Sequence, residues 1–193
     1  SLKQITLPST VKSIGDNSFE GCSSLEEIII PPYINTIGEF SFSECTSLKE
    51  IIIPPSVKYI GRNAFDGCSS LLKITISSSV PSIEEYTFTS CSSLMQIIIP
   101  SSVKVIKKYA FNGCKSLKQV MIHASLESIG SGAFYECSSL TQISIPSSIT
   151  IIEKSTFSKC SLLAQIKLPP SLKSIKANAF SDCSSLTQIT IPS

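Results

Sequence analysis

The sequence is short of charge, of histidine and of long apolar segments. Only 16% of the 193 residues are charged, and the formal net charge is +2. Charge this sparse and balanced argues against nucleic acid or an anionic membrane as the partner. No apolar run approaches the roughly 18 residues that a transmembrane helix needs, so direct membrane insertion of this segment is not expected.

What the sequence does contain is a repeat of 23 residues. A cysteine, a phenylalanine and an isoleucine each recur eight times at this step, without insertion or deletion. The cysteines are Cys22, Cys45, Cys68, Cys91, Cys114, Cys137, Cys160 and Cys183. A fixed period of this length indicates stacked supersecondary units. We therefore expect a single array over residues 1–193, made of eight repeats and the first strand of a ninth, with no internal domain boundary. Positions in each repeat are numbered 1 to 23, with Ser1 at position 1.

The first repeat shows how one unit should fold. Apolar and polar residues alternate from Gln4 to Leu7, which predicts a short strand with one buried face. Pro8 recurs in most repeats and should end this strand, because proline lacks a backbone donor. Phe19 and Cys22 are three residues apart, so positions 16 to 22 are predicted to form a helical or 3₁₀ turn. Position 15 is glycine in only four repeats, so its turn should not require a positive φ.

Stacking explains why every repeat has the same apolar residues. A unit of 23 residues cannot bury its inner face alone, so neighbouring repeats must cover it. Positions 2, 5, 7, 11, 14, 19 and 22 should form a layered core. The strands should pair in parallel about 4.8 Å apart, forming a curved parallel sheet on one face of a solenoid.

The eight cysteines are expected to be buried, free thiols. All of them occupy position 22, so their side chains should point the same way on successive layers. Their spacing should be close to the stacking distance of about 4.8 Å. The mean Cβ separation in a disulfide is shorter, about 3.8 Å. A linear column of thiols also lacks the convergent ligands of a zinc site, so no metal is expected.

No arrangement of residues indicates catalysis or a cofactor. His123 is the only histidine, and it stands where most repeats have proline, which indicates an exposed loop variant. Glu26 and Glu27 should point to opposite faces of a strand, so they do not form an acid and base pair. No glycine-rich phosphate loop follows a strand. We expect neither enzymatic activity nor a cofactor.

The repeat resembles the BspA-like, or treponemal-type, leucine-rich repeat. Its pattern, L-x-x-I-x-I-P-x-S-V-x-x-I-G-x-x-A-F-x-x-C, is seen in residues 48–68, LKEIIIPPSVKYIGRNAFDGC. The resemblance covers all 193 residues. It implies a leucine-rich-repeat solenoid of the α/β-type repeat class, rich in β-structure with short 3₁₀ or helical turns. Many such repeats have asparagine where this chain mostly has serine at position 10, so hydroxyls are expected to close that turn.

The same resemblance implies a function. Members of this family are typically surface proteins of bacteria and protists that adhere to host cells or to extracellular-matrix proteins. The chain is therefore expected to be a non-enzymatic protein-binding module at the cell surface, for adhesion or ligand recognition. Two alternatives stay open, a cytoplasmic protein-interaction scaffold and a structural or engineered repeat fragment. The absence of an N-x-[ST] glycosylation sequon mildly favours an intracellular site or a host that does not glycosylate.

The best candidate for a binding surface is formed by positions 4 and 6 of the strands, which should point away from the core. The candidate residues are Glu27, Ile29, Glu50, Ile52, Lys73, Gln96, Ile98, Gln119 and Met121. Contiguous exposed apolar surface tends to mark contact sites. The two columns could also be purely structural, because isoleucine is favoured on any pleated surface and the glutamines at position 4 could form a hydrogen-bonded ladder that stiffens the sheet.

A second candidate surface is the outer turn, where aromatic residues occur in repeats 2 to 5. These are Phe40, Tyr59, Tyr86 and Tyr109. Three of them occupy position 17 and should lie on one side of the array. Exposed aromatics can anchor a partner, although they can equally be partial cover for the core.

The two ends of the sequence lack polar capping repeats. The chain opens on the strand SLKQITLP and closes on the equivalent SLTQITIP. Both terminal layers should therefore expose apolar residues and strand edges. We expect the chain to be a fragment of a longer array, with end-to-end association between molecules as a consequence.

Overall fold

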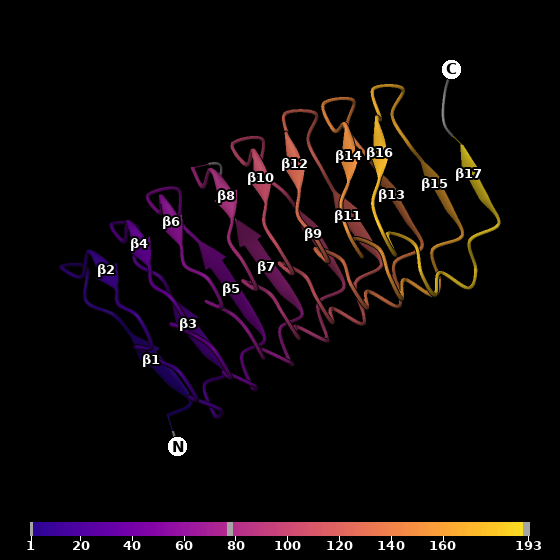
Figure 1. Ribbon diagram of the computed structural model, residues 1–193. Helices are drawn as coiled ribbons and strands as arrows, with labels where there is room; N and C mark the ends of the chain where they lie inside the picture. Colours follow the sequence, from indigo (N-terminus) through magenta and orange to yellow (C-terminus); the bar gives the residue numbers. More distant parts are fainter. Residues whose placement is uncertain (1, 77–78, 191–193) are drawn as a thin grey trace.

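The computed structural model describes residues 2–76 and 79–190, which form one stack of similar coils. Each coil is one repeat, and successive repeats lie side by side along a single axis from the N-terminus to the C-terminus (Figure 1). The predicted parallel solenoid of 23-residue units is confirmed.

Nine strands begin at position 4 of successive repeats. They are β1 (Gln4–Thr6), β3 (Glu27–Ile29), β5 (Glu50–Ile53), β7 (Lys73–Ile76), β9 (Gln96–Ile98), β11 (Gln119–Met121), β13 (Gln142–Ser144), β15 (Gln165–Lys167) and β17 (Gln188–Thr190). They pair in parallel, and each residue faces the one 23 positions later, as Gln4 faces Glu27. Strands β1, β3, β5 and β7 form one sheet, and strands β9, β11, β13, β15 and β17 form a second.

Eight shorter strands, of two residues each, begin at position 13. They are β2 (Ser13–Ile14), β4 (Thr36–Ile37), β6 (Tyr59–Ile60), β8 (Ser82–Ile83), β10 (Val105–Ile106), β12 (Ser128–Ile129), β14 (Ile151–Ile152) and β16 (Ser174–Ile175). They also pair in parallel with the neighbouring repeat, which gives every repeat a second ladder on another side of the coil (Figure 1).

The predicted helical or 3₁₀ turn at positions 16 to 22 is wrong. The described ranges contain no helix, and this stretch is a run of hydrogen-bonded turns. The backbone has a positive φ at position 17 in every repeat, from 52° to 62°, and again at position 21, from 57° to 73°. A helix needs φ near −60° at each residue, so these two positions interrupt it.

Alternate backbone amides of this turn bind the next repeat, whereas those of Glu20 and Cys22 donate within their own repeat. The N–H groups of Asn17, Phe19 and Gly21 donate to carbonyl oxygens of the second repeat, each at 2.8 Å. The same pattern continues along the array and forms a third ladder. An α-helix over this stretch would have used the Gly21 donor internally. The turn therefore gives up helical hydrogen bonds for bonds that join repeats.

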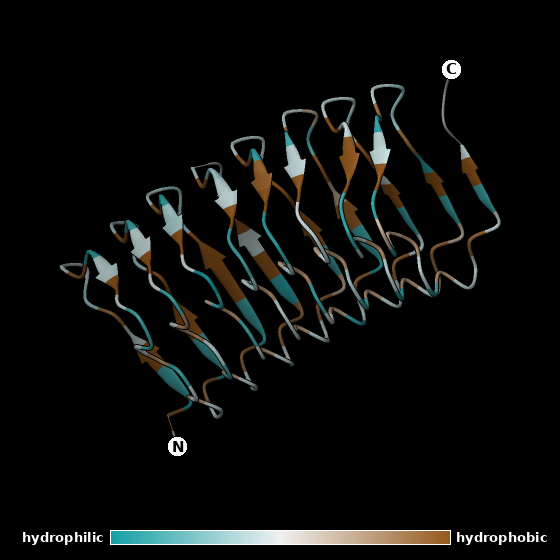
Figure 2. Ribbon diagram, in the orientation of Figure 1, coloured by the Kyte–Doolittle hydropathy of each residue, from teal (hydrophilic) through white to brown (hydrophobic). Residues whose placement is uncertain are grey.

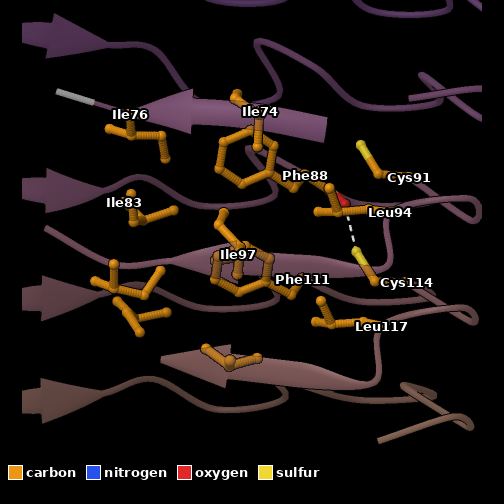
Figure 3. Close-up of a cluster of buried hydrophobic side chains, with 14 of the residues drawn as sticks. Ile74, Ile76, Ile83, Phe88, Cys91, Leu94, Ile97, Phe111, Cys114 and Leu117 are labelled. Carbon is orange, nitrogen blue, oxygen red and sulfur yellow. Dashed lines mark hydrogen bonds between the residues drawn. The ribbon is translucent and has the colours of Figure 1, made fainter. Parts of the chain in front are cut away.

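The core is a set of identical columns that run along the array (Figure 3). The phenylalanine rings at position 19 stack on one another with centroids 5.2 to 5.6 Å apart. Leucine, isoleucine and valine columns surround them, and the interior side chains are almost entirely buried. Since each layer covers the next, the core residues of the first and last layers stay partly exposed, as Phe19 and Phe180 do.

All eight cysteines are free, as predicted, and the six inner ones are buried. Each thiol from Cys45 onward donates to the carbonyl oxygen of the phenylalanine 26 residues earlier, as Cys114 Sγ does to Phe88 at 3.1 Å (Figure 3). Burial raises the pKa of Cys45 to about 12, and it also raises the pKa of the other inner thiols. The thiols of this column therefore act as small apolar core side chains, each with one weak hydrogen bond.

The serines at position 10 form bonds between repeats. Ser56 Oγ donates to the carbonyl of Ile34 in the preceding repeat at 2.6 Å, and Ser102 Oγ donates to that of Val80 at 2.9 Å. The sequence correctly pointed to these hydroxyls as hydrogen-bonding groups. They differ from the expectation in that they tie one repeat to its neighbour instead of closing their own turn.

One hydroxyl in the described part of the chain is buried without a partner, the Oγ of Ser41 at position 18. At the same position the Thr87 and Thr156 hydroxyls each donate to a nearby carbonyl, at 2.9 and 2.8 Å, and Ala64 has no hydroxyl. Because an unpaired buried polar group costs about 1–3 kcal/mol, Ser41→Ala should raise the free energy of unfolding by about 1 kcal/mol. Urea denaturation measures this change. The matched variant Thr156→Ala should lower stability, and a loss of stability in Ser41→Ala would contradict the prediction.

Candidate protein-binding face

Side chains at positions 4 and 6 of the longer strands form an exposed surface over both sheets, here called the sheet face. In β3, β9, β11, β13 and β15 the first and third residues are exposed and the second is buried. The predicted outward direction of positions 4 and 6 is therefore confirmed. In β5 the same alternation holds, with Glu50 and Ile52 exposed. Figure 2 shows that this strand begins hydrophilic and continues hydrophobic.

Four large apolar side chains at position 6 lie open to solvent on this face. Ile29 is 61% exposed, Ile52 68%, Ile98 55% and Met121 45%. Ile98 and Met121 face each other in the ladder between β9 and β11. These exposed fractions are high for isoleucine and methionine side chains, which are usually buried.

Four hollows lie on the sheet face, and the smallest, of about 230 Å³, lies over β15 and β17. The first lies over β3 and β5 and has a volume of about 550 Å³. It brings together four of the residues selected from sequence, Glu27, Ile29, Glu50 and Ile52. Two carboxylates and two isoleucines thus meet at one depression, so the hollow offers both apolar contact and negative charge.

A second hollow, of about 510 Å³, lies over β7 and β9. Three of the candidate residues, Lys73, Gln96 and Gln119, line it. Three further lining residues were missed, all at position 3: Leu72, Met95 and Lys118. The sequence did contain a signal for Leu72 and Met95, because position 3 is charged in the first three repeats and apolar in the fourth and fifth.

A third hollow, of about 430 Å³, extends over β11, β13 and β15. Its lining includes Gln119, Met121 and, at its far side, Lys167. Ile98 lines none of the hollows, although it is exposed on the same face of β9 as Gln96. The structure therefore places all nine candidate residues on one face.

Ion pairs neutralise only one edge of this face. Glu26 accepts from Lys49 at 3.0 Å and lies 3.5 Å from Lys3. The hydrogen bond from Lys49 and its positive charge, followed by those of Lys3, lower the pKa of Glu26. Within residues 2–76 and 79–190, no ion pair engages Glu27 or Glu50, and no hydrogen bond joins two glutamine side chains of position 4.

The aromatic residues of the outer turn are only partly gathered. Tyr86 and Tyr109 stack with centroids 5.4 Å apart, and Tyr135, which the sequence did not single out, meets Tyr109 edge-on at 6.4 Å. Asn63 occupies position 17 between Phe40 and Tyr86. The fourth candidate aromatic of this turn, Tyr59, lies apart on β6.

Cations cover part of this aromatic group. Lys108 lies over the Tyr109 ring and Lys159 over the Tyr135 ring, 5.4 and 5.1 Å from the centroids. These contacts occupy ring faces that a partner would otherwise use. The sheet face is therefore the stronger candidate.

The single histidine does not belong to a metal-binding group in the described residues. His123 is exposed, as predicted. No group of three or more histidine, cysteine, aspartate or glutamate side chains in residues 2–76 and 79–190 could hold a metal ion. The same ranges contain no helix long and apolar enough to cross a membrane.

Known proteins share both the repeat and the fold. The family model for the BspA type leucine-rich repeat region matches residues 1–95 and 82–193. A leucine-rich repeat protein from Bacteroides ovatus is 32% identical with a TM-score of 0.79; the match covers 97% of this chain and 54% of that one. The leucine-rich repeat protein of T. pallidum is 26% identical with a TM-score of 0.67, over 96% and 78% of the two chains.

A third solved structure is described as a leucine-rich cell surface protein from Faecalibacterium prausnitzii. It is 25% identical with a TM-score of 0.50, over 97% of this chain and 72% of that one. No curated protein matches the chain. The chain spans about half the length of the Bacteroides ovatus protein. With a family model that matches along its whole length, the chain belongs to the BspA-type leucine-rich repeat family.

Proposed function

We propose that this chain is a non-enzymatic protein-binding module of a cell surface, and that it holds its ligand on the sheet face. The observation that carries the proposal is the row of exposed apolar side chains, Ile29, Ile52, Ile98 and Met121, beside the three larger hollows. Exposed Thr75 divides the row into two apolar pairs, Ile29 with Ile52 and Ile98 with Met121, and exposed apolar surface of this kind tends to mark a contact site.

The surface location is supported by the relatives. The Faecalibacterium prausnitzii structure is described as that of a cell surface protein, and the fold of this chain is similar to it. A ligand on a host cell or in the extracellular matrix fits such a location. The alternative is a cytoplasmic interaction scaffold, and antibody labelling of intact, unpermeabilised source cells distinguishes the two.

The test is a binding screen of the chain against immobilised extracellular-matrix proteins, repeated with the double variant Ile52→Asp/Ile98→Asp. Both side chains are more than half exposed, so the variant should fold normally. Each aspartate would bring an unpaired charge into the interface, so we expect binding to weaken at least tenfold, which corresponds to about 1.4 kcal/mol.

The matched control is Ile151→Asp. Ile151 is 37% exposed and lies on β14, in the second ladder, away from the sheet face. This control should bind as the unmodified chain does. Equal binding by the double variant, or an equal loss in the control, would show that the ligand does not sit on the sheet face.

A further inference from the structure

The three larger hollows adjoin across the strands and are here called the trough, and the smallest hollow lies beyond its β15 end. The first and second share Glu50, and the second and third share Gln119. The trough runs along the array from β3 to β15, six strand spacings or about 29 Å. An extended polypeptide of about nine residues has this length.

Charge is unevenly distributed along the trough. Glu27 and Glu50 lie at the β3 end, whereas Lys118 and Lys167 lie toward the β15 end. Lys73 marks the change of sign, because it faces Glu50 in the ladder. None of these five side chains forms an ion pair in the described ranges. Glu26 and Lys49, which also line the first hollow, pair with each other and so add no net charge to it.

The two carboxylates at the β3 end repel each other. Glu27 and Glu50 face each other in the parallel ladder, which places their backbones about 4.8 Å apart. Like charges directly opposite on neighbouring strands are unfavourable. A guanidinium group carries several donors in a flat fork and can bind both carboxylates at once.

Apolar side chains accompany both charged ends. Ile29 and Ile52 lie beside the two glutamates, Leu72 and Met95 line the middle, and Met121 lies in the third hollow. Leu72 and Met95 are exposed, at 43% and 47%. A ligand of one charge sign cannot satisfy both ends, which excludes a nucleic acid strand.

We infer that the trough binds one extended protein segment, with a cationic side chain over Glu27 and Glu50, apolar side chains along the middle, and an anionic side chain near Lys118 and Lys167. This inference rests on the proposed function and specifies its partner. The cationic and anionic side chains should be about six or seven residues apart, as measured from the strand spacing.

The experiment is a selection of random twelve-residue peptides, displayed on phage, against the whole chain. Enriched peptides should combine arginine or lysine with aspartate or glutamate six or seven residues away, in either order, and apolar residues between them. Enrichment of uniformly basic or uncharged peptides, or no enrichment over an unrelated target, would overturn the inference.

Two double variants then test the selected peptides. Glu27→Gln/Glu50→Gln should weaken binding at least tenfold. The matched control Glu20→Gln/Glu127→Gln removes the same number of charges from exposed positions outside the trough and should leave binding within twofold. Equal effects of the two variants would mean that overall charge, and not the trough, controls binding.

The variant Ile52→Asp/Ile98→Asp separates this inference from the proposed function. Peptides that lose binding to the aspartate variant but not to Glu27→Gln/Glu50→Gln would leave the sheet face as the binding surface and refute the charge arrangement. Peptides that bind both variants normally would refute the proposed function as well.

Discussion

The protein should unfold cooperatively as the pH rises from about 9 toward 12. Burial raises the pKa of the six inner thiols, and for Cys45 the pKa rises from an ordinary value of 9.0 to about 12. Above pH 9 these thiols lose protons in the unfolded chain but keep them in the folded one. The stabilisation by each thiol is therefore complete below pH 9 and is lost as the pH rises toward the folded pKa.

The expected loss of stability per pH unit follows from proton linkage. Each thiol should lower the free energy of unfolding by about 1.4 kcal/mol per pH unit, so six thiols give a slope of about 8 kcal/mol per pH unit. A typical domain has a total stability of about 5–15 kcal/mol, so the fold should be lost close to pH 10. Urea denaturation followed by circular dichroism at a series of pH values measures this slope.

The control is the double variant Cys68→Ala/Cys114→Ala. It leaves four buried thiols, so the slope above pH 9 should fall by about a third, whatever the stability of the variant at neutral pH. An unchanged slope would show that the alkaline transition comes from other groups, such as tyrosine and lysine.

Phe111→Ala should lower the free energy of unfolding by about 4 kcal/mol. The Phe111 ring is fully buried and stacks on Phe88 at 5.3 Å and on Phe134 at 5.4 Å. Its removal leaves a cavity in the middle of the array. Because the stability of a stacked array depends on the contacts between neighbours, the variant should also uncouple the two halves.

The denaturant unfolding transition of Phe111→Ala should therefore be broader, and its free energy of unfolding should be lower. The comparison variant is Phe19→Ala, since Phe19 is only partly buried and stacks on one neighbour, Phe42, at 5.2 Å. We expect this variant to lose about half as much stability, roughly 2 kcal/mol. Equal losses in the two variants would contradict the account of the phenylalanine column as a chain of nearest-neighbour contacts.

The longer strands, their register and the thiol column were predictable from sequence, whereas the two-residue strands at position 13 were not predicted. A residue that recurs every 23 positions must occupy the same place in every layer, so a single unit describes the whole array. Alternation around Ile28 and Ile51 correctly placed these side chains inside and their neighbours Ile29 and Ile52 outside.

The turn at positions 16 to 22 was not predicted correctly, although a signal was present. Asparagine and glycine at position 17, as in Asn17 and Gly132, and glycine at position 21, as in Gly67, are typical of positive φ. The signal was weak because Tyr86, Tyr109 and Lys159 adopt the same backbone. A spacing of three residues between Phe19 and Cys22 fits a helix equally well, and it cannot show that the amides bind the next repeat.

Sequence periodicity thus determined the solenoid, its in-register strands and the outward direction of the nine candidate residues. These properties belong to a single repeat, and each further repeat has them because it is the same unit shifted along the axis. Stacking decided the rest. The hollows that join Glu27 to Ile52, and Lys73 to Met95, exist between layers, where side chains that differ from repeat to repeat leave space. The hydrogen bond of each thiol and the third backbone ladder also cross from one repeat to another. The pattern of a single repeat contains no information on contacts that two repeats make together, so the tertiary structure was needed to reveal them.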